Sequence, residues 1–151
     1  MGFNIVLVEP EIPHNTGSIA RTCVLTNTSL HLVKPLGFSV DDKNLKRAGL
    51  DYWHLVDIHY YDKFEDLLAK YLKGEFYFAT SKTDNLYTDF QYKPESFFVF
   101  GKETKGLPRE ILDRNRDRTI KIPMMNDIGR SYNLANSANV ILFEALRQRG
   151  F

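Results

Sequence analysis

Short apolar runs alternate with stretches of helical periodicity along this 151-residue chain. This alternation is the feature that most constrains the fold, because strands separated by helices assemble into a parallel sheet with helices on its faces. We therefore expect an α/β fold in which a mostly parallel sheet is flanked by helices. The predicted strands are residues 4–8, 30–33, 56–61, 76–80, 96–100 and 119–122.

Helices are predicted in the segments between these strands and after the last one. Asn15 and Thr16 are expected to cap the first helix, which runs to about Thr26. The other predicted helices are residues 62–72, capped by Asp62, then 108–115 and 133–149, with a short helical turn over 45–50. Ligands of parallel sheets bind beyond the carboxyl ends of the strands. The loops after residues 8, 80, 100 and 122 are therefore the predicted ligand site.

Composition narrows the class of protein. The length predicts a single domain over residues 1–151. A net charge of +1 argues against a strongly basic, non-specific nucleic-acid binder, so an RNA site has to come from local clusters of Lys and Arg. A single cysteine, Cys23, leaves no internal disulfide and suits the reducing cytoplasm. We expect no signal peptide, no membrane span and no metal, since the histidines lack metal-ligand spacing.

The first candidate site motif is E-P-E-I-P-H-N-T-G-S-I-A-R, which starts at Glu9 and ends at Arg21. It follows a strand and opens a helix, so Asn15 and Gly17 would let the backbone approach a ligand at the positive helix end. Arg21 lies about one and a half turns further along. A plain helix cap followed by a solvated arginine is an equally good interpretation of this motif.

The second motif is F-G-K-E-T-K-G-L-P, from Phe100 to Pro108. Its glycines permit positive φ and close approach of the backbone to a ligand. It lacks the G-x-G-x-x-G pattern of dinucleotide sites and the G-K-[ST] of phosphate-binding loops, which argues against NAD-dependent and NTP-hydrolysing classes. The alternative interpretation is a tight connection between a strand and a helix.

The third motif is I-P-M-M-N-D-I-G-R-S-Y-N-L-A-N-S-A, which starts at Ile122 and ends at Ala138. Arg130, Ser131 and Asn133 lie between a strand end and a helix, where a polar ligand would be held. Ser131 and Asn133 have the simpler interpretation of N-caps.

Basic residues gather in three groups. A charge run is usually a solvated face, but the second group is interleaved with the glycine loop, where phosphate contacts would position an RNA. The groups are Lys43, Lys46 and Arg47; Lys102, Lys105 and Arg109; and Arg114, Arg116, Arg118 and Lys121.

In this order and spacing, the three motifs resemble the three motifs of the SPOUT methyltransferases. N-T-G-S-I-A-R is similar to the first and F-G-K-E-T-K-G-L-P to the second. I-P-M, followed after a gap by R-S-Y-N-L-A-N-S-A, is similar to the third. The segments L-K-R-A-G-L-D-Y-W, over residues 45–53, and E-A-L-R-Q, over 144–148, resemble the single-domain branch of this family, the tRNA (cytidine/uridine-34)-2′-O-methyltransferases.

The resemblance implies a deep trefoil knot in the C-terminal part of an α/β fold. It implies S-adenosyl-L-methionine bound in a bent shape and a homodimer whose site uses both subunits. The implied reaction is 2′-O-methylation of nucleotide 34, a cytidine or 5-substituted uridine, in the anticodon stem-loop of tRNA. The alternatives are another RNA such as rRNA, a non-catalytic RNA-binding protein on the same fold, and a flavodoxin-like binder of a small ligand.

The resemblance also implies roles for individual residues. Arg21, Ser131 and Asn133 match catalytic positions. The implied cofactor-binding residues are Ala79, Thr80, Ser81, Gly101, Glu103, Gly106, Ile122, Met124, Ser131 and Ala135. The implied RNA-binding residues are Asn15, Arg21, Lys46, Arg47, Lys105 and Arg130.

Two positions depart from the family pattern, since Tyr132 replaces a Leu or Met and Phe143 stands where some relatives carry Tyr. For the dimer, we expect the first and last helices to supply the apolar contact between subunits. The last helix would contribute Ala135, Ala138, Ile141, Leu142 and Ala145, a stripe that equally fits an ordinary core.

Overall fold

The protein is described here by a computed structural model that defines residues 2–39 and 53–150. The predicted helical turn over 45–50, together with Lys43, Lys46 and Arg47, lies outside the described residues. The strands are β1 (Asn4–Val8), β2 (Ser29–Val33), β3 (Ile58–Tyr61), β4 (Phe76–Ala79), β5 (Phe97–Phe100) and β6 (Thr119–Ile120). The α-helices are α1 (Pro13–Leu25), α3 (Phe64–Lys70), α4 (Arg109–Arg114) and α5 (Leu134–Arg149). Two 3₁₀ turns cover Trp53–Leu55 and Arg116–Arg118.

These strands form one sheet in the order β3-β2-β1-β5-β4-β6, and every pairing is parallel. The predicted α/β fold with a parallel sheet is confirmed. β1 lies inside the sheet, and its neighbours β2 and β5 are far apart in the sequence. The chain continues from β1 toward one edge of the sheet and from β5 toward the other, so the strand order switches direction between these two neighbours. In open parallel sheets, ligands bind at the carboxyl ends of the strands at such a switch point.

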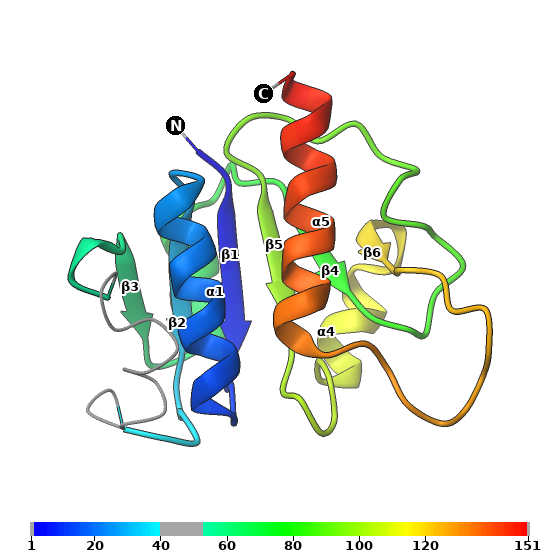
Figure 1. The fold of residues 1–151 in the computed structure, drawn as a ribbon, viewed down its shortest axis with the longest axis horizontal. Coiled ribbons are helices and arrows are strands. Elements are labelled where there is room, and N and C mark those ends of the chain that lie inside the picture. Colours follow the sequence, from blue (N-terminus) through cyan, green and yellow to red (C-terminus); the bar gives the residue numbers. More distant parts are fainter. Residues whose placement is uncertain (1, 40–52, 151) are drawn as a thin grey trace.

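The sheet separates two hydrophobic cores, and successive residues of β1 face them alternately. Ile5 and Leu7 pack with α1 and α5, which lie side by side over one face of the sheet (Figure 1). Val6 and Val8 pack with α3 and α4 on the other face. Because the central strands are buried on both faces, they are continuously apolar, and this is why the sequence pattern located them.

Several element boundaries differ from the prediction. α1 begins at Pro13, which suits a first helical position because proline has no N–H to leave unpaired. The prediction that Asn15 and Thr16 cap this helix is therefore wrong. Both are buried residues of its first turn. α3 begins at Phe64 rather than being capped by Asp62. Asn133 is the N-cap of α5, which was the simpler of its two interpretations from the sequence. Its side chain accepts a hydrogen bond from the backbone N–H of Asn136 at 3.2 Å.

The residues expected to form the dimer contact from α5 are buried within the chain itself. Ala135, Ala138, Ile141, Leu142 and Ala145 pack in the core between α5 and the sheet. That expectation is wrong, because these side chains already have an intramolecular partner in the sheet and α1. The exposed apolar residues of α5 are instead Val140 and Phe143. In the described part of the chain, no helix is long and apolar enough to cross a membrane.

Candidate functional site

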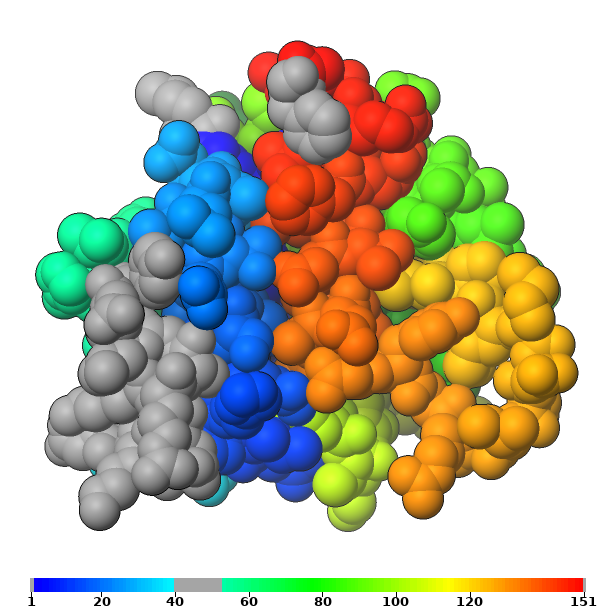
Figure 2. All heavy atoms as spheres, viewed as in Figure 1, coloured from blue at the N-terminus to red at the C-terminus, as the bar shows by residue number. Residues whose placement is uncertain are grey.

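A cavity of about 520 Å³ lies beyond the carboxyl ends of β4, β5 and β6. The start of α5 and the loop that precedes it form its outer wall. In Figure 2 this hollow lies between the orange base of α5 and the amber to orange loop beside it. Segments from all three sequence motifs therefore meet at one end of the sheet, the end where the fold is expected to hold a ligand.

Most of the predicted cofactor-binding residues line this cavity. They are Ala79, Thr80, Ser81, Gly101, Glu103, Ile122, Met124 and Ser131. Two predicted residues do not line it. Ala135 is buried in the first turn of α5 as part of the core, and Gly106 borders a second hollow beside α4.

The two glycines of the second motif shape a tight turn after β5. The Gly106 N–H donates to the Lys102 carbonyl at 2.8 Å, and Gly106 has a φ of 69°. A Cβ on Gly101 would lie 2.1 Å from the carbonyl carbon of Gly106, so only glycine fits there. The structure thus shows the tight strand-to-helix connection of the alternative interpretation, with Gly101 also on the cavity wall.

The Glu103 carboxylate joins the second motif to the first. Its two oxygens accept hydrogen bonds from the backbone N–H groups of Glu11 and Ile12, each at 2.8 Å. Oε2 also accepts from the Asn15 side-chain amide at 3.3 Å. Such bonds to an ionised acceptor are about twice as strong as neutral ones. Glu103 therefore holds the chain in the orientation in which it enters α1.

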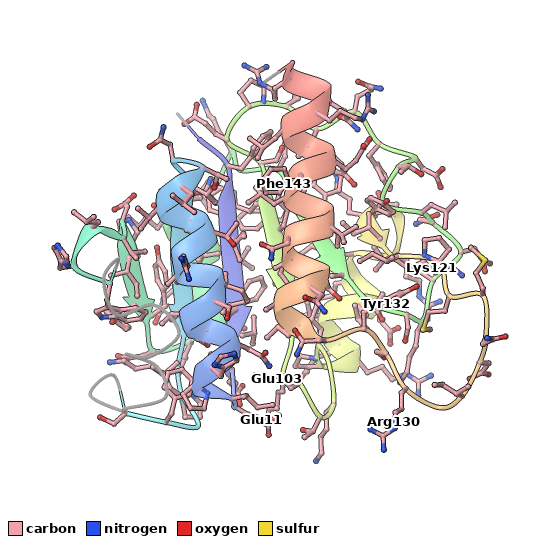
Figure 3. All side chains as sticks on the ribbon, viewed as in Figure 1. Glu11, Glu103, Lys121, Arg130, Tyr132 and Phe143 are labelled. Atoms are coloured by element: carbon pink, nitrogen blue, oxygen red, sulfur yellow. The ribbon has the colours of Figure 1, made fainter. Side chains whose placement is uncertain are left out.

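The contact is reciprocal, and we call it the loop clasp: Glu103 with Glu11 and Ile12, Glu11 with Thr104, and Glu9 with Lys102. The Glu11 carboxylate accepts from the Thr104 hydroxyl at 2.8 Å and from its backbone N–H at 3.0 Å. These two bonds hold the pKa of Glu11 below its usual value. The Lys102 ammonium lies 3.4 Å from the Glu9 carboxylate. Figure 3 shows Glu11 and Glu103 next to each other below α1.

A chain of hydrogen bonds extends the loop clasp to the third motif. The Asn133 side-chain N–H donates to the Asn15 side-chain oxygen at 3.1 Å, and Asn15 in turn donates to Glu103. Asn133 also caps α5, so one residue fixes both the helix start and the side of the cavity. Sequence reasoning missed Glu11, Thr104 and the linking role of Asn15. The only signal for these contacts was the pair of glutamates in E-P-E.

The loop between β6 and α5 is tied back on itself by Tyr132, whose hydroxyl donates to the Pro123 carbonyl at 2.9 Å. This contact connects the two ends of the loop that covers the cavity. Tyr132 itself lines the cavity and stays about half exposed. Arg130 also lines it, and Figure 3 shows its side chain pointing outward from the loop.

The remaining predicted residues are spread over three places. Asn15, Ser131 and Asn133 line the cavity. Lys105 borders the hollow beside α4 instead. Arg21 is an exposed residue of α1 and does not line the cavity of its own chain. Within residues 2–39 and 53–150, no group of three or more His, Cys, Asp or Glu side chains is placed to hold a metal ion.

The sequence matches a known protein family and several proteins over nearly its full length. Residues 2–143 match the model of the SpoU rRNA Methylase family. A protein of Geobacillus stearothermophilus named "Putative tRNA (cytidine(34)-2'-O)-methyltransferase" is 51% identical over 154 residues, covering 100% of this chain and 98% of its own. A tRNA (cytidine(34)-2'-O)-methyltransferase of Methylovorus glucosotrophus is 46% identical over 150 residues, covering 99% of this chain and 97% of its own.

Solved structures agree with the sequence relatives. A structure described as giving insights into the 2-OH methylation of C/U34 on tRNA superposes with a TM-score of 0.92 at 38% identity, covering 97% of this chain and 95% of its own. The sequence relatives and this solved structure therefore match nearly the full length of the chain, and the structure shares its overall fold.

Proposed function

Because the chain belongs to the SpoU rRNA methylase family, we propose that it methylates the ribose 2′-hydroxyl of nucleotide 34 of tRNA, a cytidine or 5-substituted uridine. The methyl donor is S-adenosyl-L-methionine, and the site of action is the cytoplasm. The observation that carries the proposal is the cavity at the strand ends, which three motifs line together and the loop clasp holds in place. Full-length relatives with this activity in their names support the substrate.

The residues of the cavity suit S-adenosyl-L-methionine. Its volume of about 520 Å³ lies in the range of small-molecule sites. Ile122, Met124 and Leu134 offer apolar surface for an adenine ring, whereas Thr80 and Ser81 offer hydroxyl groups for polar atoms. When bound, the cofactor supplies a methyl group already activated by its positively charged sulfur. The protein therefore mainly has to align the methyl group with the ribose oxygen.

Glu103 and Asn133 act in this proposal as positioning residues. Their hydrogen-bonding atoms are occupied by Glu11, Ile12 and Asn15, so they support the cavity wall instead of reaching the reacting atoms. Ser131 differs, because its hydroxyl lines the cavity and forms no hydrogen bond within the described residues. We assign Ser131 to contact with the substrate ribose.

Arg21 is assigned the charge-stabilising role. The 2′-hydroxyl loses its proton to solvent water during transfer, because a guanidinium stays protonated in proteins and cannot take it. Arg21 instead stabilises the negative charge that develops on the 2′-oxygen, or anchors the adjacent phosphate. Arg21→Ala is therefore expected to abolish turnover and leave the affinity for S-adenosyl-L-methionine nearly unchanged. Equal losses of both would contradict this role.

A homodimer is part of the proposal, because Arg21 does not line the cavity of its own chain. α1 and α5 lie side by side over the same face of the sheet and carry the exposed apolar residues Leu25, Val140 and Phe143. A second copy packed on this face would cover these side chains and bring its Arg21 toward the cavity. The implied trefoil knot belongs to the same proposal and is tested by a crystal structure.

Mixing two inactive variants tests the shared site. Chains with Arg21→Ala and chains with Ser131→Ala are each checked for loss of activity, then unfolded together and refolded. If Arg21 acts on the partner's cavity, half the dimers are mixed and each holds one intact site, so about a quarter of the wild-type activity returns. No recovery, with dimers confirmed by light scattering, would refute the shared site.

The reaction is tested by transfer of labelled methyl groups to total tRNA from a strain that lacks the modification, with the labelled nucleotide identified after digestion. We expect label in 2′-O-methylcytidine or 2′-O-methyluridine at position 34. Binding of S-adenosyl-L-methionine without label on tRNA would point to another RNA. Neither binding nor label would leave the non-catalytic RNA-binding alternative.

A further inference from the structure

A second and larger hollow, of about 960 Å³, lies beside α4 on the other side of the turn over residues 102–106. We call it the α4 cleft. Nothing in the proposed chemistry at the cavity uses it. Its walls are Glu9, residues 82–85, Lys102, residues 105–109, Leu112, Asp113, Arg116 and Thr119.

The α4 cleft carries an excess of positive charge. Its basic residues are Lys82, Lys102, Lys105, Arg109 and Arg116, and its acidic residues are Glu9, Asp84 and Asp113. Two of the acids are already neutralised, Glu9 by Lys102 at 3.4 Å and Asp113 by Arg116 at 2.8 Å. Lys82 and Lys105 have no ion-pair partner within the described residues, and Arg109 has only a distant one at 3.9 Å. These cations are available to an anionic ligand.

The other walls complement a nucleotide. Pro108 and Leu112 are partly exposed and provide an apolar side against which a base can lie, backed by the buried Leu107. Asp84 provides an exposed carboxylate with no ion-pair partner in the described part of the chain, and it can accept hydrogen bonds from ribose hydroxyls or base amino groups. Cations, an apolar wall and one acceptor together match the phosphate, base and sugar of a nucleotide.

The α4 cleft adjoins the cavity. Lys102 lines both hollows, and the loop after β4 contributes Thr80 and Ser81 to the cavity and the next residue, Lys82, to the cleft. A polyanion that leaves the cavity across Lys102 therefore meets Lys82 and Lys105 next. A free mononucleotide would need no such adjacency, so the arrangement favours a strand that occupies both hollows.

We propose that the α4 cleft binds the nucleotides of the RNA strand that adjoin the nucleotide held in the cavity. This inference rests on the proposed function for the identity of the RNA. Lys82 and Arg109 contact its phosphates, while the wall of Pro108 and Leu112 contacts a base.

The test compares two double variants of the full-length protein. Lys82→Ala/Arg109→Ala removes two cations of the cleft and breaks only the distant pair with Asp113. Lys63→Ala/Lys73→Ala is the matched control, because it removes two exposed lysines that border neither hollow. Affinity for tRNA is measured against salt concentration. Calorimetry of S-adenosyl-L-methionine binding verifies that both variants keep the cavity.

Each phosphate contact to a single strand contributes about 0.7 to the slope of log affinity against log salt. The cleft variant is expected to lose about 1.4 from the slope and several-fold to tenfold in tRNA affinity, whereas the control keeps both. Equal slopes for the two variants would overturn the proposal. If the wild type binds tRNA but transfers no methyl group, the proposed function fails, and the slope comparison still decides the cleft. Binding of cytidine monophosphate is measured as well. If only the cleft variant loses it while its tRNA affinity is unchanged, the ligand of the cleft is a free nucleotide and the proposal of an RNA strand is wrong.

Discussion

Replacing Glu103 with Gln separates two roles for this residue, the loop clasp and direct contact with the cofactor. Gln has the same shape but offers one oxygen acceptor where the carboxylate offers two. One of the backbone N–H groups of Glu11 and Ile12, both now bonded at 2.8 Å, would face an amide N–H. A hydrogen bond to a charged group contributes about 1.5–3 kcal/mol, and the remaining bond weakens when it becomes neutral. Since the site is partly exposed, we expect the free energy of unfolding to fall by about 2–3 kcal/mol.

Urea unfolding at fixed protein concentration measures this change, with Glu110→Gln as control. Glu110 is exposed in the first turn of α4, and its loss should cost only a few tenths of a kcal/mol through the helix dipole. Binding of S-adenosyl-L-methionine is measured in parallel by calorimetry.

The reasoning is refuted if Glu103→Gln keeps the wild-type free energy of unfolding to within about 0.5 kcal/mol. If its affinity for S-adenosyl-L-methionine falls tenfold or more at the same time, Glu103 is a ligand of the cofactor and not a clasp. A loss of stability with little change in affinity is the expected outcome.

Three further substitutions and one pH titration test other features. Tyr132→Phe removes the bond to the Pro123 carbonyl, worth about 0.5–1.5 kcal/mol, so calorimetry should show an affinity for S-adenosyl-L-methionine about 2–10-fold weaker; an unchanged affinity would contradict a role for this bond. Gly101→Ala places a methyl group 2.1 Å from the Gly106 carbonyl carbon and should lower the free energy of unfolding by about 3 kcal/mol or more. Gly106→Ala has open space and only the positive φ to accommodate, about 1–2 kcal/mol, so thermal melts that rank the two variants the other way would refute the tight-turn argument. Burial lowers the pKa of His31 to about 3. The unfolded chain therefore binds one more proton between about pH 6.5 and pH 3, and stability falls on acidification by up to about 1.4 kcal/mol per pH unit from this residue. NMR should show the His31 ring protons unchanged down to about pH 5, and a midpoint near 6.5 would contradict the burial argument.

The sequence located the strands well because their burial on both faces leaves a continuous apolar run, as in β1 and β5. The start of α1 was predicted wrongly, because the side chain that holds this segment, Glu103, is some 90 residues away in the sequence. Local pattern therefore assigned a capping role to Asn15, whose side chain instead links Glu103 to Asn133.

The site residues show the same limit. Motif order indicated which loops would meet, and most of the named residues do line one cavity. Composition does not specify the direction of a turn, so Gly106 was predicted among the cofactor-binding residues although it borders the α4 cleft and not the cavity. The alanines of α5 have a pattern that fits a core and a subunit contact equally well. Only the packing of α5 against the sheet shows that these alanines belong to the core.

The packing of α1 against α5 joins the first helix of the chain to the last. During synthesis at ~5–20 residues per second, about 6–25 s separate completion of α1 from completion of α5. Throughout that interval Ile19, Ala20 and Cys23 lack the helix that covers them in the finished fold. β1 likewise waits for β5 before its second edge is paired. The apolar side chains of α1 and the unpaired edge of β1 are therefore accessible to other chains for this interval, which makes aggregation a greater risk during synthesis than after it.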